Sequence, residues 1–420
     1  MMQNEMTIGR AKQEDIPPRV RRFSNQRWLL DNIIKANGPE WDQPRLASLV
    51  AALGPEAAAD AAAIRQRVQK LADMSPAFAW AARMREEKAA LAAADGHRIT
   101  ARDNYFMAAN YWAAAQWSID QNDAYNRSLN SRKRECFKRF AGLADHPVQE
   151  VWIPFDGRAL PGWLHLPPGY SGGRIPLVVS IPGMDGFKER SVSLHGDPWL
   201  SRGIAVLAVE GPGQYESAML GIYVSMPAWQ WTGRAIMDWL VARPEFDGAR
   251  IGIIGRSFGT FFASIAIAHE PRFRAAAIHA PCLEPGCWTI FEEASPTYKR
   301  RFMYMAGLVD EDAFDAFRPG LTWQGHAQRI EAPFLCIAGE ADELSPFSHV
   351  EDFVRALRGP KRLVVYEGSR HTVAGVPSTH LGPSPTSVMA DWMSARLDGT
   401  PFDSERWQIN AAGRVTKSAL

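Results

Sequence analysis

A serine between two glycines, in the motif Gly255-Arg256-Ser257-Phe258-Gly259, is the part of this chain best suited to chemistry. The short apolar run Ile251–Ile254 before it is typical of a strand, and the small apolar run Phe261–Ala268 after it favours a helix. Strand, G-x-S-x-G and helix in this order form a sharp turn that lifts a serine hydroxyl clear of a sheet. Glycines on both sides leave the room that such a turn needs. We therefore predict that Ser257 is a nucleophile.

A serine hydroxyl needs a base to take its proton and an acid to hold that base. Asp342 follows an apolar run that ends at Ala338, and His371 follows an apolar run that ends at Tyr366. Ser, Asp and His in this order, two of them just past a predicted strand, match the triad order of α/β-hydrolases. We predict the triad Ser257, Asp342 and His371. The competing acids are Glu340, Glu343 and Asp352, and the competing base is His380.

The oxyanion of an acyl transfer reaction needs two backbone N–H donors. We expect one from Phe258, which follows the nucleophile, and the other from Met184 in the turn Pro182–Gly186. Glycines in that turn let backbone N–H groups face a ligand. The N–H of Asp185 is the alternative to that of Met184.

The second part of the chain predicts a sheet of buried parallel strands, because short runs rich in Val and Ile alternate with helical segments. A hairpin pair followed by six runs gives an eight-stranded, mostly parallel α/β sheet with helices on both faces. The expected strands are 151–157, 160–166, 175–181, 204–209, 251–254, 275–278, 334–338 and 362–366. The segment 284–328 breaks this alternation and is expected as a helical insertion after the sixth strand, over the carboxyl ends of the strands where ligands bind.

Residues 1–147 are rich in Ala, Leu, Arg, Glu and Gln and predict a helical N-terminal cap or lid domain. The catalytic domain is expected over 148–400 and a C-terminal tail over 401–420. The helices expected in the N-terminal domain are 44–53, 56–73, 77–94, 99–119 and 122–142.

The composition is that of an ordinary globular protein, with 46% hydrophobic and 22% charged residues and a net charge of +1. This balance argues against nucleic acid or an anionic membrane as the main partner. The first six residues lack the apolar core of a signal peptide, so we expect a cytoplasmic protein. The four cysteines fit no metal motif and no cofactor motif occurs in context, so neither a metal nor a cofactor is expected. A Cys282–Cys287 pairing stays open.

Three further motifs narrow the family. They are Pro182-Gly183-Met184-Asp185-Gly186-Phe187-Lys188-Glu189, Glu210-Gly211-Pro212-Gly213-Gln214-Tyr215-Glu216, and Arg243-Pro244-Glu245-Phe246-Asp247 ahead of Arg250. With the triad they resemble the α/β-hydrolase superfamily over 148–395. The similar group contains 2,6-dihydropseudooxynicotine hydrolase, fungal polyketide-shortening hydrolases and fermentation-respiration-switch esterases. Members carry a helical N-terminal region, which suits residues 1–147.

The resemblance implies hydrolysis at a carbonyl of a small molecule, either of a C–C bond in a β-dicarbonyl compound or of an ester. The chain departs from the group at Glu210 and Tyr215, where Asp and Gly are common, which implies a different pocket rim. A leaving carbanion would need an added donor, and Lys188, Arg256 and His279 are candidates. The aromatic content of the helical segments favours an aromatic substrate. The expected pocket residues are Tyr105, Trp112, Lys188, Tyr215, Arg256 and Trp288.

Two other classes of protein stay open. A catalytically silent α/β-hydrolase scaffold would act as a ligand sensor or a protein-binding partner. A serine peptidase of the prolyl-oligopeptidase kind shares the catalytic domain, but residues 1–147 are helical and too short for a β-propeller. The sequence leaves open whether the helical region forms a homodimer interface.

Overall fold

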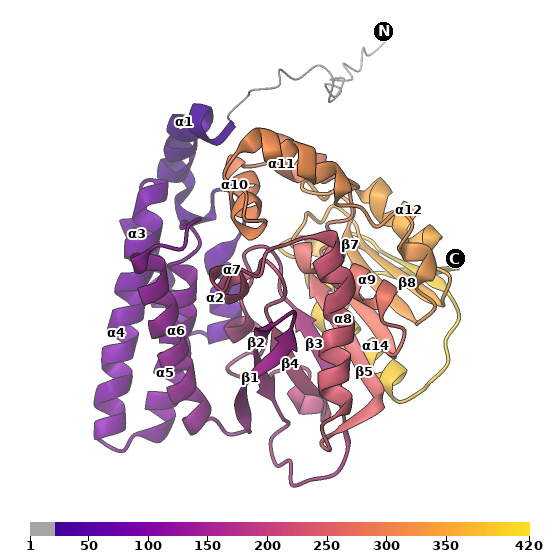
Figure 1. Ribbon diagram of the computed structural model, residues 1–420, viewed down its shortest axis with the longest axis horizontal. Helices are drawn as coiled ribbons and strands as arrows, with labels where there is room; N and C mark the ends of the chain where they lie inside the picture. Colours follow the sequence, from indigo (N-terminus) through magenta and orange to yellow (C-terminus); the bar gives the residue numbers. More distant parts are fainter. Residues whose placement is uncertain (1–21) are drawn as a thin grey trace.

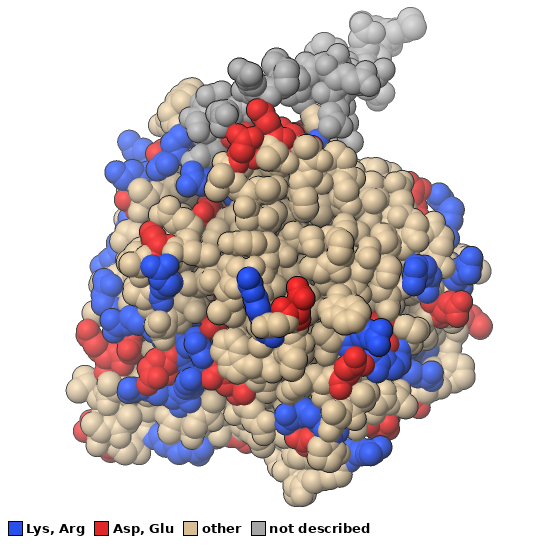
Figure 2. Space-filling view, in the orientation of Figure 1, with Lys and Arg blue, Asp and Glu red and all other residues tan. Residues whose placement is uncertain are grey.

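The computed structural model describes residues 22–420. The first six residues, whose composition argued against a signal peptide, lie outside this range. Figure 1 shows a layer of roughly upright helices beside a sheet that is flanked by helices. None of the helices within residues 22–420 has the length and apolarity that a bilayer crossing requires. The face in Figure 2 has charged side chains of both signs near its margins and few near its centre.

The described residues form one sheet with the strand order β1-β2-β4-β3-β5-β6-β7-β8-β9-β10. β1 with β2, β2 with β4, and β9 with β10 pair antiparallel, and all the other pairs are parallel. The strands are β1 (Val148–Phe155), β2 (Arg158–His165), β3 (Ile175–Ile181), β4 (Ala205–Val209), β5 (Phe246–Arg256), β6 (Ala275–His279), β7 (Phe334–Gly339), β8 (Lys361–Tyr366), β9 (Glu405–Ile409) and β10 (Val415–Ala419).

The predicted count of eight strands is wrong, because the described chain contributes ten to this sheet. The first eight strands lie at the predicted runs, whereas β9 and β10 arise from the segment that was expected to be a tail. In β9 only Ile409 is fully buried, and every residue of β10 is exposed. Neither strand therefore carries the continuous apolar run of a strand buried on both faces. The predicted class, a mostly parallel sheet with helices on both faces after a helical region, is confirmed.

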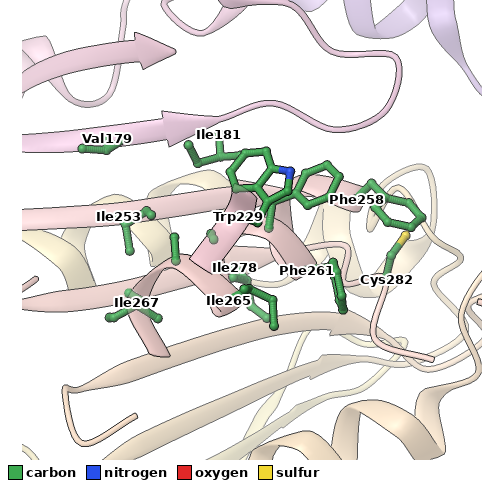
Figure 3. Packing of buried hydrophobic residues seen from close by; sticks show 14 of the residues in the cluster. Val179, Ile181, Trp229, Ile253, Phe258, Phe261, Ile265, Ile267, Ile278 and Cys282 are labelled. Carbon is green, nitrogen blue, oxygen red and sulfur yellow. The ribbon is translucent and has the colours of Figure 1, made fainter. Parts of the chain in front are cut away.

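Helices cover both faces of the sheet. One face packs against α8, α9 and α12, and the other packs against α14. Figure 3 shows Trp229, Phe258 and Phe261 in the cluster on the first face, together with the strand residues Ile181, Ile253 and Ile278. The α-helices after β4 are α7 (Tyr215–Met219), α8 (Met226–Val241), α9 (Phe258–His269), α10 (Pro296–Met305), α11 (Glu311–Phe317), α12 (Phe347–Ala356), α13 (Pro377–Leu381) and α14 (Pro385–Leu397).

The N-terminal helices pack on one another and on the edge of the sheet that holds β1 and β2. Small alanines let α4 and α5 approach closely, and the buried rings of Phe106, Phe137 and Phe140 fill the space between α5 and α6. Trp163 of β2 lies 4.6 Å from Phe137, ring centre to ring centre, which joins the helices to the sheet. The helices are α1 (Arg22–Asn37), which was not predicted, α2 (Arg45–Leu53), α3 (Ala57–Arg67), α4 (Met74–Ala94), α5 (Arg98–Ala114) and α6 (Ala124–Leu143).

The insertion between β6 and β7 contains α10 and α11, which lie above the sheet in Figure 1. Phe302 of α10 packs on Phe258 at the start of α9, with ring centres 4.7 Å apart. Arg301 of α10 donates to the carbonyl of Ile119 at 3.0 Å, and Tyr304 donates to Asn122 at 2.6 Å. The insertion and the N-terminal helices therefore meet near the carboxyl ends of the strands.

Candidate active site

Ser257 lies in the sharp turn between β5 and α9, with φ 53° and ψ −128°. Such a conformation costs a non-glycine residue about 1–3 kcal/mol, and it persists only where the surrounding structure enforces it. A Cβ atom on Gly255 would lie 2.3 Å from the carbonyl oxygen of Gly259, and one on Gly259 would lie 2.3 Å from that of Ile181. The two glycines are therefore required by close backbone contacts, and they allow the turn that presents the serine.

The structure brings Ser257, His371 and Asp342 together. Ser257 Oγ lies 2.8 Å from His371 Nε2, and His371 Nδ1 lies 2.9 Å from Asp342 Oδ2. The other Asp342 oxygen accepts the N–H groups of Leu344 and Ser345, which fixes the carboxylate. In this arrangement the imidazole can accept the hydroxyl proton while the carboxylate fixes the tautomer and orientation of the ring.

The electrostatic environment stabilises the protonated imidazole. Burial by itself would lower the pKa of His371, but the Asp342 carboxylate outweighs this effect and raises that pKa well above its usual value. The histidine can therefore take a proton readily and hold it until a leaving group accepts it.

The competing residues lie elsewhere. Glu343 accepts the backbone N–H of His371 at 3.0 Å, so it holds the histidine loop and not the ring. Glu340 accepts the N–H of Gly368 at 3.3 Å, and Asp352 bonds to Arg355 on the exposed side of α12. His380 is exposed on α13.

The turn after β3 packs directly against the nucleophile. A Cβ atom on Gly183 would lie 2.9 Å from both the Arg256 carbonyl oxygen and Ser257 Cβ. Phe258 is the first residue of α9, and the N–H groups of a first helical turn have no partner within the helix. Within residues 22–420, neither the N–H of Phe258 nor that of Met184 donates to a protein acceptor. Both donors are available to an oxyanion.

The helical region holds this turn through Asp185, which our sequence analysis did not anticipate. Trp117 Nε1 donates to the Asp185 carbonyl oxygen at 2.8 Å, and Arg45 Nη2 donates to the Asp185 carboxylate at 2.7 Å. The Tyr215 hydroxyl reaches the same carbonyl oxygen at 3.4 Å. Trp117 lies near the end of the helix predicted over 99–119, and neither it nor Arg45 belongs to a sequence motif that points to the turn.

Lys188 was expected in the substrate pocket, but the structure buries it in a network of ion pairs. Its Nζ lies 2.7 Å from Glu216, 3.1 Å from Glu189 and 3.2 Å from Glu210. Burial alone would lower the pKa of Lys188, but these three carboxylates raise it well above its usual value. Lys133 of α6 joins the network through Glu189 at 3.6 Å. Lys188 therefore links the helical region to the sheet and is not a free donor for substrate.

The other expected pocket residues divide into two groups. Tyr105 bonds to Arg139 and Trp112 bonds to Glu86, so both lie among α4, α5 and α6 and not at Ser257. Trp288 bonds to Glu293 at the start of the insertion.

Two of the expected pocket residues lie near the nucleophile. Tyr215 is buried beneath the Asp185 turn, and its φ of 26° lies in the region that favours glycine. Arg256 directly precedes the nucleophile and is exposed.

Cys282 also lies beside the triad, and its role was not foreseen. Its Sγ is 3.9 Å from both Ser257 Oγ and His371 Nε2. Thr260 accepts the N–H of Cys282 and donates to the Ser257 carbonyl oxygen, which ties the turn to the segment after β6. Cys282 and Cys287 are both buried free thiols, so the pairing left open above does not occur.

A hollow of about 260 Å³ lies far from this site, beside Arg274, Pro333 and Pro360. These residues precede β6, β7 and β8, so the hollow is at the amino ends of the strands. The triad lies at the opposite, carboxyl ends, where ligands bind in sheets of this kind.

Comparisons with known proteins agree with this fold. Residues 234–400 match the prolyl oligopeptidase family, and residues 156–285 match the X-Pro dipeptidyl-peptidase (S15) family. The α/β hydrolase xenA of Xenoacremonium sinensis is 32% identical over 54% of this chain and 54% of its own length. The chain thus spans about half the length of this curated relative. The 2,6-dihydropseudooxynicotine hydrolase of Paenarthrobacter nicotinovorans is 26% identical over 73% of this chain and 80% of its own length.

A solved structure, that of the 2,6-dihydroxy-pseudo-oxynicotine hydrolase, superposes with a TM-score of 0.72. It is 24% identical and covers 85% of this chain and 98% of the other. The predicted resemblance is thereby confirmed, and the protein has the α/β-hydrolase fold and is similar in sequence to known α/β-hydrolases.

Proposed function

We propose that this protein is a serine hydrolase of small carbonyl compounds, with Ser257 as nucleophile, His371 as base and Asp342 as the acid that orients it. The observation that carries the proposal is the unbroken pair of hydrogen bonds from Ser257 Oγ through the imidazole to Asp342, of 2.8 and 2.9 Å. The strained backbone at Ser257 supports it, because strain of this kind is concentrated at functional sites.

In the first half of the reaction, His371 Nε2 takes the hydroxyl proton while Ser257 Oγ bonds to the substrate carbonyl carbon. The carbonyl oxygen becomes an oxyanion that accepts from the N–H groups of Met184 and Phe258. Collapse of this intermediate breaks the bond to the leaving group, which receives the proton held by His371. Water then attacks the acyl-serine with His371 again as base, which releases a carboxylic acid and restores Ser257.

We further propose an aromatic or polyketide-like substrate that is cleaved at a C–C bond next to a ketone, as in a β-diketone. The similarity to a hydrolase named for 2,6-dihydropseudooxynicotine supports this class. The buried rings of Phe258, Phe291 and Phe302 pack on one another and join the aromatic insertion to the start of α9, next to Ser257. Ester hydrolysis is the second candidate, since the same acyl-enzyme forms and an alkoxide leaving group needs only the His371 proton.

The test compares wild-type protein with Ser257→Ala. The wild type should react with a fluorophosphonate probe and should hydrolyse a 4-nitrophenyl ester, and the variant should do neither. A panel of aryl β-diketones and aryl esters, with product masses measured, then separates C–C from ester cleavage. Wild-type protein that is folded, unlabelled and inactive would contradict the proposal and favour a catalytically silent scaffold.

A further inference from the structure

Two arginines near Ser257 have no acidic partner. Arg256 immediately precedes the nucleophile, and Arg190 follows the oxyanion turn, at the end of the short 3-10 helix Lys188–Arg190. Within the described part of the chain, neither guanidinium forms a hydrogen bond or an ion pair with a carboxylate. The acidic residues around them are engaged: Asp185 bonds to Arg45 at 2.7 Å, and Glu189 lies 3.1 Å from Lys188.

The two cations lie within electrostatic reach of each other, with Arg190 half-buried and Arg256 exposed. Burial and the neighbouring charge of Arg256 lower the pKa of Arg190 to about 10. Arg256 is open to solvent, so an anion can reach it. Two like charges near each other repel, and a bound anion would offset this repulsion.

A third nitrogen-bearing side chain lies on the same side of the sheet. His279 ends β6 and is paired in register with Arg256, so the two side chains leave the same face. His279 is only 8% exposed, and its buried Nε2 has no hydrogen-bond partner among the described residues. A buried polar atom without a partner requires an explanation. The carbonyl oxygen of His279 accepts the Ser257 N–H at 3.1 Å, so this histidine directly adjoins the nucleophile.

We propose that Arg190, Arg256 and His279 bind a carboxylate group of the substrate beside Ser257. This inference rests on the proposed hydrolase function and narrows its substrate class to ketones or esters that also carry a carboxylate. A guanidinium presents paired donors that match the planar shape of a carboxylate. A neutral imidazole adds a single donor, which would satisfy His279 Nε2. The carboxylate would anchor one end of the substrate and leave its reacting carbonyl over Ser257 Oγ.

The test uses two esters of the same acyl length, 4-nitrophenyl valerate and mono-4-nitrophenyl glutarate, which differ in a terminal carboxylate. The measured quantity is the ratio of kcat/KM for the anionic ester to that for the neutral ester. We expect Arg256→Met and Arg190→Met each to lower this ratio at least about 10-fold, because a hydrogen-bonded charge pair is lost. Arg256→Lys keeps the charge but loses the paired donors, so it should lower the ratio less than Arg256→Met does. Arg274→Met, at an exposed arginine at the opposite ends of the strands, is the matched control and should leave the ratio unchanged.

The outcomes separate this inference from the function on which it rests. In the first outcome, the wild type hydrolyses esters and Ser257→Ala does not, so the hydrolase proposal stands. If the ratio of kcat/KM for the anionic ester to that for the neutral ester is then the same in Arg256→Met as in the wild type, the proposed carboxylate site is wrong. If the wild type hydrolyses neither ester, the hydrolase proposal fails. The site is then judged by calorimetric binding of 3-phenylpropionate against 3-phenylpropionamide. Binding of the acid alone, lost in Arg256→Met, supports the site, and equal or undetectable binding of both overturns it.

Discussion

Trp117, from the helical region before the sheet, donates its Nε1–H to the backbone carbonyl oxygen of Asp185 across 2.8 Å. Asp185 immediately follows Met184, whose N–H we assign to the oxyanion. A hydrogen bond between regions distant in sequence thus fixes the Asp185–Gly186 peptide, in the same turn as a proposed catalytic donor. The N-terminal region therefore contacts the proposed site as well as packing on the edge of the sheet.

Trp117→Phe should lower kcat by about 10-fold and change KM less than about 2-fold. The ring and its packing stay, but the Asp185 peptide loses its donor and the oxyanion turn loosens. The loss should be smaller than the 100-fold or more that follows removal of an oxyanion donor itself. Steady-state kinetics on an aryl ester measure both constants.

Trp112→Phe is the matched control, because Trp112 lies in α5, just before the turn that holds Trp117, and its Nε1 bonds to Glu86 away from Asp185. It should leave kcat within about 2-fold, and melting temperatures should show that both variants are folded. Equal kinetic losses in the two variants would mean that the Asp185 contact has no special role.

The dependence of activity on pH follows from the histidine. His371 must be neutral to accept the serine proton, and the Asp342 carboxylate raises its pKa above the usual value. Activity should therefore be lost on the acid side of a midpoint that lies above the ordinary histidine pKa of about 6.5. Asp342→Asn removes the charge that raises this pKa, so the midpoint should move to lower pH while kcat falls about 10⁴-fold. A pH profile of kcat/KM with an unmoved midpoint in Asp342→Asn would contradict this account.

A third prediction follows from the close contact between Gly183 and the nucleophile. Gly183→Ala places a methyl group 2.9 Å from Ser257 Cβ, so the turn or the serine must shift. We expect kcat to fall about 100-fold, since small misplacements of reacting groups can cost this much. Gly142→Ala, in α6 where an added Cβ meets nothing within 4 Å, is the control and should keep full activity. Equal rates of fluorophosphonate labelling in the two variants would show that the turn tolerates the methyl group.

The elements that carry the triad could be predicted because their signals are local. Ser257 lies in a motif between a strand and a helix, and Asp342 and His371 follow apolar runs that became β7 and β8. The choice of Asp342 over Glu343, one residue away, rests on the direction of each side chain. In the structure Glu343 accepts the backbone N–H of His371, whereas Asp342 bonds to the imidazole ring.

The remaining features depend on contacts between distant segments. Trp117 and Asp185 are 68 residues apart, and no local pattern pairs them. Lys188 looked like a free cation near a predicted ligand turn, but Glu210 and Glu216 approach it from a different loop. β9 is half-buried and polar, so its apolar signal is too weak to distinguish a sheet edge from a tail.

Lys188→Met should lower the free energy of unfolding by about 3–5 kcal/mol, because the buried carboxylates of Glu189, Glu210 and Glu216 lose their shared cation. Lys88→Met removes an exposed lysine that pairs with Glu56 and should cost at most about 1 kcal/mol. Urea unfolding measures both values. If Lys188→Met left the free energy of unfolding unchanged and greatly raised KM, Lys188 would have a substrate-binding role instead of a structural one.

The last prediction concerns β9, which pairs with the outer edge of β8. The chain continues from the carboxyl end of β8 to His371. Ile409 is fully buried and its carbonyl oxygen accepts the N–H of Glu367 at 2.9 Å, between β8 and the histidine. Ile409→Ala should lower the free energy of unfolding by about 2–5 kcal/mol. Val415→Ala on the exposed β10 should change it by less than about 0.5 kcal/mol. Since the histidine loop borders β9, hydrogen exchange of the Glu367 amide should also accelerate in Ile409→Ala. Equal stability and equal exchange in both variants would mean that β9 does not support the loop.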